Sequence, residues 1–458
     1  MNAKEQTVAE MQRRVKLLPD ELAEWKTLTV EKMEDFGIHT SQIEAIDDFF
    51  DERIALHEEY LVELQNAAND DDLAYWRSEL EAELGGAHGL MMVFRNILAQ
   101  RFDTDRYRDT LDAADLIAAD CYRPCIAQVV KWHVLEDGQF RVPPLTFLNA
   151  RSSPQALSRG KKFRAFGFDL DSREMSLSLP FSFVSLRYHD TTALWTYCTI
   201  HHEVGHLLDQ DLGLAEELGQ LLTESPGPGI DAQRVPAWSG WLKETIADVF
   251  GVLLGGAGFA YTLADLLFLP ASEALQSPAG GEHPPPYLRV FLLGALLRRT
   301  LVPELDQIAG EIEENWQSIY GGPPALQEPY LEDCAAMAKL LLSTHLRERL
   351  QVHRLRNFVP HLDQDHERVV SLSAYLCNGG PAPDAATFPM RLTPAAARLA
   401  VHKVQQGHST AYADIHQRAL DFALSIPHDE IMAPGGLEPE QKQYLRELAR
   451  RVRFGDAG

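Results

Sequence analysis

Apolar residues recur at helical spacing through the first third of the chain. Between residues 43 and 64 they lie three, four or seven positions apart, and acidic residues fill the opposite face. These apolar positions are Ile43, Ile46, Phe50, Ile54, Leu61 and Leu64. Ser41 and Glu44 form a capping-box pattern just before them. We therefore predict that residues 1–135 are helical and that one helix begins at Ser41.

A two-residue period replaces the helical one between about residues 140 and 190. Met175, Leu177 and Leu179 alternate with serine in the stretch EMSLSLPFSFVSLRY. This alternation is typical of a half-buried strand. Pro180 has no N–H to donate to a neighbouring strand. We therefore predict a strand around Met175–Phe183 at the edge of a sheet.

The next stretch, HDTTALWTYCTIHHEVGHLLDQDLGL, returns to a helical pattern. Asp190 has a side chain suited to cap the start of a helix, and Gly213 suits the end of a helix because it has no side chain to oppose a left-handed backbone conformation. We predict one long helix between these two residues.

The run Val249–Ala271 is long and apolar enough to span a membrane. It nevertheless carries Asp265, a cluster of glycines and Pro270. We therefore expect a buried helical hairpin and no membrane span.

Loops rich in proline and glycine divide the rest of the chain, and the segments between them are mainly helical. These loops lie at residues 225–237, 278–286, 321–329 and 378–389. With 458 residues, the chain exceeds one ordinary core. We predict a mainly α chain with a small β component, of the α+β class. Its parts would be a helical N-terminal region (1–140), a mixed central domain (141–345) and a helical C-terminal region (346–458).

Charge narrows the classes of partner. The chain has 42 basic and 67 acidic residues, a formal net charge of −25. This charge repels phosphate backbones and anionic lipid surfaces, so we expect no nucleic acid and no membrane surface as a partner. The N-terminal sequence MNAKEQTVAEMQRRVK has no apolar core, so we expect no secretory signal there.

The cysteines indicate a reducing compartment. They are few, odd in number and scattered, which fits reduced and mostly buried thiols better than a disulfide framework. The five are Cys121, Cys125, Cys198, Cys334 and Cys377. Cys121 and Cys125, with His133 downstream, lack the CxxC spacing of a zinc site. We therefore expect a cytoplasmic protein.

The predicted helix contains the motif HHEVGH, residues 201–206. His202 and His206 are four positions apart, so their imidazoles share one helix face and can bind one cation. Glu203 lies about 100° round the helix, where its carboxylate can reach a metal-bound water without becoming a ligand. This arrangement is what metal-assisted hydrolysis requires, but the motif needs a third ligand.

The segment WLKETIADVFG, residues 241–251, offers that ligand. Glu244 and Asp248 are four positions apart on an otherwise apolar helix. Glu244 would complete a His2Glu zinc site. Asp248 would accept the second N–H of a ligand histidine and fix its tautomer.

These two segments resemble the gluzincin metallopeptidases, such as thermolysin, in which HExxH is followed by ExxxD on a second helix. The segment EHPPPYLRV, residues 282–290, is similar to the His-Pro segment of the HtpX-like and prenyl-protein peptidases. The resemblance covers about residues 170–295. It implies a zincin-like catalytic domain that binds Zn²⁺, with His283 at the active site and Arg289 paired with a nearby carboxylate.

The chain also departs from these families. Thirty-seven residues separate His206 from Glu244, more than thermolysin-type enzymes have, and the transmembrane helices of the membrane-bound relatives are missing.

Other metal arrangements fit the sequence less well. A metzincin requires Gly and then His or Asp where this chain has Asp209 and Leu212. A di-iron bundle requires two ExxH motifs, and only Glu203 and His206 form one. Three further acidic residues remain alternative third ligands, although none has a partner acid at the right spacing. They are Glu216, Glu217 and Glu224.

The sequence therefore predicts a zinc peptidase. Zn²⁺ would be held by His202, His206 and Glu244, with Asp248 behind them, and Glu203 and His283 would be catalytic. The substrate would be a peptide or protein, paired with the edge strand. Two alternatives remain open: a binding or regulatory protein with a structural zinc site, and a zinc hydrolase of a non-peptide amide. The helical terminal regions would restrict access or bind a regulatory protein.

Overall fold

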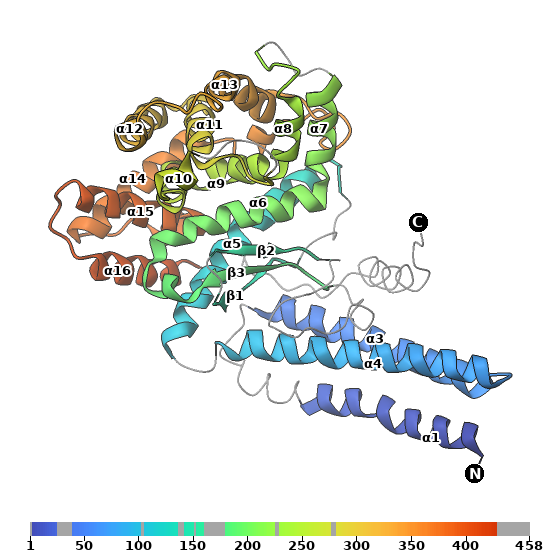
Figure 1. Cartoon of the computed structure of the whole chain (residues 1–458). Helices are drawn as coiled ribbons and strands as arrows, with labels where there is room; N and C mark the ends of the chain where they lie inside the picture. Colours follow the sequence, from blue (N-terminus) through green and yellow to red (C-terminus); the bar gives the residue numbers. More distant parts are fainter. Residues whose placement is uncertain are drawn as a thin grey trace.

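The computed structural model describes residues 2–24, 39–101, 105–135, 142–150, 153–159, 179–224, 229–275 and 281–427. This part of the chain is mostly helical and contains one three-stranded sheet (Figure 1). The structure thus confirms the prediction of a mainly α chain with a small β component.

Three N-terminal helices lie together below the sheet in Figure 1: α1 (Ala3–Val15), α3 (Thr40–Asn66) and α4 (Asp70–Ala99). Phe49, Phe50 and Phe94 pack edge to face between α3 and α4, with centroids 5.3–6.3 Å apart. The predicted capping box is wrong, because α3 begins at Thr40. Ser41 lies inside the first turn, and its hydroxyl donates to the side chain of Gln42.

The sheet has the order β1-β3-β2, with β1 at Leu145–Asn149, β2 at Gln155–Leu157 and β3 at Phe183–Arg187. β3 pairs in parallel with β1 and antiparallel with β2. The predicted edge strand is therefore misplaced. Residues 175–178 lie outside the described residues, and residues 179–182 come before the strand begins. β3 itself is the central strand of the sheet and not an edge strand. Pro180 lies three residues before β3, so it removes no hydrogen bond from the ladder.

Helix α6 (Cys198–Leu212) carries HHEVGH at its middle. It is shorter than predicted, because two 3-10 turns, η2 (Tyr188–Thr192) and η3 (Leu194–Tyr197), precede it. Asp190 does not cap α6, since its carboxylate accepts two hydrogen bonds from Arg187 at 2.7 and 2.8 Å. Gly213 ends the helix as predicted, with a φ of 66° that favours glycine.

Helix α9 (Leu242–Leu266) crosses α6 in the centre of the molecule. Within the described ranges it is the one helix long and apolar enough to cross a membrane, and 94% of its most apolar window is buried in the protein. The predicted burial of this segment is confirmed, and α9 consists of two helical stretches that meet at a kink at Gly256, where φ is 52° and ψ is −130°. Glycine takes this conformation without the strain that a side chain would add. The hairpin stays a prediction.

A glycine allows α6 and α9 to approach closely. A Cβ added at Gly205 would lie 2.8 Å from the Cα of Ala247 and 2.9 Å from the Cβ of Phe250. Gly205 lies between His202 and His206, and Ala247 between Glu244 and Asp248. The close crossing therefore brings the two predicted metal-binding segments together.

The remaining helices surround this pair, and the main hydrophobic core runs without a break from α5 to α16 across residue 345. The predicted domain boundaries stay a prediction. All five cysteines are free and buried, as expected. The helices are α5 (Asp105–Lys131), α7 (Leu214–Glu224), α8 (Val235–Gly240), α10 (Ala271–Ala274), α11 (Pro286–Arg299), α12 (Pro303–Tyr320), α13 (Glu328–Ser343), η4 (Leu355–Phe358), α14 (Leu362–Asn378), η5 (Ala385–Thr387), η6 (Met390–Leu392), α15 (Thr393–Gln405) and α16 (Tyr412–Ser425).

Candidate metal centre

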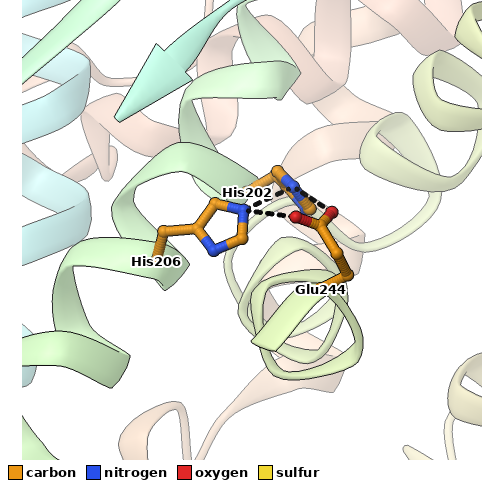
Figure 2. Close-up of side chains that lie close together, drawn as sticks. All are labelled: His202, His206 and Glu244. Atoms are coloured by element: carbon orange, nitrogen blue, oxygen red, sulfur yellow. Dashed lines mark hydrogen bonds and ion pairs between the residues drawn. The ribbon is translucent and has the colours of Figure 1, made fainter. Parts of the chain in front are cut away.

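The structure brings together the three predicted ligands, His202 and His206 on α6 and Glu244 in the first turn of α9 (Figure 2). The two Nε2 atoms lie 3.1 Å apart. Glu244 places Oε2 3.4 Å from Nε2 of His202 and Oε1 3.3 Å from Nε2 of His206. Two nitrogens and a carboxylate thus face a common point.

The spacing of these donors suits one zinc ion. Ligand bonds of about 2.1 Å in a tetrahedral site put neighbouring ligand atoms about 3.4 Å apart. The three observed separations, 3.1 to 3.4 Å, are close to that value. Glu244 Oε2 is also buried, and it lies 3.2 Å from Nη2 of Arg289 and 3.4 Å from Nε2 of His202. A buried carboxylate of this kind requires positive charge close to it.

Asp248 orients the first histidine. Nδ1 of His202 donates to Oδ1 of Asp248 at 2.9 Å, which turns Nε2 toward the common point. Arg289 holds Asp248 in turn with two hydrogen bonds of 2.7 and 2.8 Å. The predicted contact between Arg289 and a nearby carboxylate is thus present, and Arg289 also lies 3.2 Å from Glu244.

The electrostatics keep these acids ionised. Burial alone would raise the pKa of Glu244, but hydrogen bonds from His202 and His206 lower it well below its usual value. Burial would likewise raise the pKa of Asp248, but Arg289 lowers this pKa below its usual value. For His202, burial lowers the pKa, but Asp248 and Glu244 outweigh it and raise the pKa to about 9. A metal ion that binds here would therefore displace a proton from His202.

Glu203 lies beside the ligands without being one of them. It is buried on α6, and this burial raises its pKa, while His202 and His206 act in the opposite direction. A hydrogen bond from the backbone of Ala156 in β2 also lowers the pKa. Glu203 is thus held between the metal-binding helix and the edge of the sheet.

His283 reaches the site from the loop before α11. Its ring is 59% exposed, and Nε2 lies 3.3 Å from Oε1 of Glu244. Tyr287 in the same segment is buried, and its hydroxyl donates to the backbone of Gly321 at 3.0 Å, so it supports the fold. The structure therefore brings His283 to the predicted site.

A cleft of about 870 Å³ opens over these groups. Residues 153–158, which include β2, form one wall, and Phe259, Leu263 and Leu266 form an apolar end. β2 was not predicted from the sequence. Its three residues are too few to show a periodicity, and only the preceding Pro154 marks a break in the chain.

The alternative ligands have other partners. Glu217 accepts hydrogen bonds from the backbone of Arg347 and Arg349, at 2.5 and 2.8 Å. Glu216 pairs with the side chain of Arg349. Glu224 accepts from Gln220 at 2.9 Å. These acids are therefore engaged away from the two histidines.

A second group of possible ligands, His39, Asp112 and Asp115, also lies together. Both oxygens of Asp115 are already used. They accept hydrogen bonds from Arg101 at 2.6 and 3.1 Å and from the backbone and side chain of Thr146, each at 2.7 Å. An arginine thus already neutralises this carboxylate, which makes a metal site here unfavourable.

Comparison with known proteins identifies no relative of this chain. The chain matches no protein-family model, no curated protein and no solved structure.

Proposed function

We propose that this chain is a zinc-dependent peptidase of the gluzincin type, with a zincin-like arrangement of α6, α9 and the sheet. The observation that carries the proposal is the cluster of three potential metal ligands, His202, His206 and Glu244. Its separations suit zinc, and its first histidine is already oriented by Asp248. Two histidines and one carboxylate leave a fourth position for water or substrate, as catalytic zinc sites do.

Zinc would supply the Lewis acidity that polarises the scissile carbonyl and acidifies a water. The other steps fall to the chain. Glu203 would take the proton from the attacking water and deliver it to the leaving amine. Its raised pKa, caused by burial, suits a group that both takes and gives a proton. His283 would donate a hydrogen bond to the oxygen of the substrate carbonyl.

The edge strand β2 supports a peptide as substrate. Among the described strands its one neighbour is β3, and its residues line the cleft. Backbone groups in an antiparallel strand alternate between its two sides. Because the N–H of Ala156 points to Glu203, its carbonyl faces the cleft too. An extended peptide would donate a hydrogen bond to this carbonyl.

The cleft disfavours a purely structural metal. A structural zinc is closed by four protein ligands and needs no base beside it. Here three ligands face an open cleft, and a buried carboxylate, Glu203, lies next to them.

Chelation tests the proposal directly. The protein would be assayed on a library of quenched fluorescent peptides before and after removal of metal. We expect cleavage to disappear with the metal and to return on addition of about one equivalent of zinc. A non-peptide anilide assayed in parallel distinguishes the other hydrolase class. Peptide cleavage that survives complete metal removal would contradict the proposal.

A further inference from the structure

Arg159, two residues after β2, is tied to the metal-binding helix by its side chain. Its Nε and Nη2 donate to the two oxygens of Asp211 at 3.0 and 2.6 Å. Asp211 lies on α6, five positions after His206. Nη2 also donates to the hydroxyl of Tyr122 on α5, and this hydroxyl donates to Asp211 at 2.5 Å. A closed triangle of hydrogen bonds thus joins β2, α5 and α6.

The backbone of Arg159 is held as well. Its N–H donates to Oγ of Ser182, directly before β3, at 3.1 Å. Its carbonyl accepts from the side chain of Gln210 on α6 at 3.4 Å. Both backbone groups and the guanidinium of one residue are therefore fixed, two of the three to α6.

This triangle is buried and charged. The side chains of Arg159 and Asp211 are 9% and 3% exposed. Burial alone would lower the pKa of Arg159, but Asp211 raises it, so the guanidinium stays charged. Burial raises the pKa of Tyr122, which keeps its hydroxyl neutral and able to donate. A buried bidentate ion pair, such as the one between Arg159 and Asp211, is strong and holds its two partners in one geometry.

The strand itself is too short to hold its own position. β2 has three residues and a single neighbouring strand among those described. Edge pairing of that length is marginal. Two attachments to α6 supplement it: Ala156 to Glu203, and Arg159 to Asp211. Ser158 and Gln210, the chain neighbours of the ion pair, line the cleft, and the pair lies behind this wall.

We infer that Arg159 is a positioning residue that fastens β2 to α6 and thereby sets the register of an extended peptide over the metal centre. The inference rests on the proposed function. The side chain of Arg159 binds Asp211 and Tyr122, neither of which is a proposed metal ligand, so its loss would act on the binding of extended substrate through β2.

The chain offers a matched control. Arg234 donates to both oxygens of Asp333 at 2.7 Å, and Nε1 of Trp238 donates to the same carboxylate at 2.8 Å. This is the same combination of an arginine, an aspartate and an aromatic donor, outside the cleft. Arg159→Gln would therefore be compared with Arg234→Gln, and Arg159→Lys would serve as the conservative variant.

Steady-state kinetics give the first readout. For Arg159→Gln we expect KM for an extended peptide to rise by about tenfold or more, with kcat changed by less than about threefold. Zinc content and inhibition by acetohydroxamate, a small metal-binding probe, should stay at wild-type values. Arg159→Lys should raise KM less than Arg159→Gln does, and Arg234→Gln should leave KM unchanged. An unchanged KM in Arg159→Gln, or equal losses in Arg159→Gln and Arg234→Gln, would overturn the inference.

Hydrogen exchange separates this inference from the proposed function. In Arg159→Gln, the amides of residues 153 and 155–158 should exchange at least about tenfold faster, while those of His202 and His206 keep their rates. Arg234→Gln should leave the exchange of 153–158 unchanged. This readout needs no activity, so it still decides the inference if the wild type cleaves no peptide. Unchanged exchange in Arg159→Gln contradicts the inference even if the peptidase proposal holds.

Discussion

At the scale of single residues, the proposed site is a chain of oriented groups that runs from Arg289 through Asp248 to His202. Each member restricts the next, so the ring nitrogen that would bind metal is fixed before any metal arrives. Arrangements of this kind raise metal affinity as well as geometric precision.

Asp248→Ala should therefore weaken zinc binding without removing a ligand. We expect the affinity for zinc to fall by about 10- to 100-fold, since His202 loses its acceptor. Competition against a chelator of known affinity measures this. Asp265→Ala is the control, because Asp265 is a second aspartate of α9 that pairs with an arginine, Arg398, outside the site. Equal effects in both variants would contradict the role of Asp248.

Two buried histidines predict sensitivity to acid. Burial lowers the pKa of His57 to about 3 and that of His201 to about 4. Below pH 6.5 the unfolded chain binds protons at these positions and the folded protein does not. For each histidine, the free energy of unfolding therefore falls by about 1.4 kcal/mol per pH unit as the pH drops from 6.5 toward the pKa of that histidine in the folded protein.

His57→Leu tests this dependence. The free energy of unfolding in urea, measured at pH 7, 6 and 5, should fall less steeply in the variant than in the wild type. Parallel curves for the two proteins would show that His57 is not neutral in the folded state.

The sequence predicted the ligand residues because their signals are local. Spacings of four positions place His202 with His206, and Glu244 with Asp248, on single helix faces whatever the fold around them. Ala156 and Arg159 carry no such signal. Their roles come from contacts with residues 47 and 52 positions away, which no local period reveals.

At the scale of elements, the site depends on the crossing of α6 and α9. Gly205→Ala should destabilise the protein by about 1–3 kcal/mol and weaken zinc binding, because the new methyl group would meet the backbone of α9. Gly310→Ala is the matched control, since a Cβ there would meet nothing within 4 Å. Thermal unfolding and zinc titration of both variants check this. Wild-type zinc affinity in Gly205→Ala would contradict the close approach.

Element boundaries were predicted less well than element types. The period of helix α3 was correct, but its start was not, because Ser41 bonds to Gln42 rather than to the helix backbone. Asp190 likewise bonds to Arg187 instead of capping α6. A capping residue with a competing partner gives the same sequence pattern as one that caps.

At the scale of the whole molecule, the helices before the sheet do not form one unit. α1 packs on α3 and α4 through a small separate cluster that includes Met11 and Val15. α5 belongs instead to the main core, where Leu116 and Ile117 are buried. The sequence indicated helices throughout residues 1–135, but helical periodicity does not show which core each helix joins.

Truncations should separate these two groups. Removal of residues 1–15, through the end of α1, should leave a folded protein that binds about one zinc, because α1 packs in the small cluster away from the site. Removal of residues 1–135 takes α5 out of the main core and should prevent folding. Circular dichroism and metal analysis of both truncated proteins check this. A folded, zinc-binding chain from residue 136 would contradict the assignment of α5.

The most direct test of the central claim compares the wild type with Glu203→Gln. Metal analysis and peptide cleavage would be measured on the same preparations. Both proteins should bind about one zinc, because Glu203 is not a ligand. The kcat of Glu203→Gln should be lower by about 10²- to 10⁴-fold, because the amide cannot take the proton from water. Wild-type protein without zinc, or equal peptide turnover in the two, would contradict the central claim.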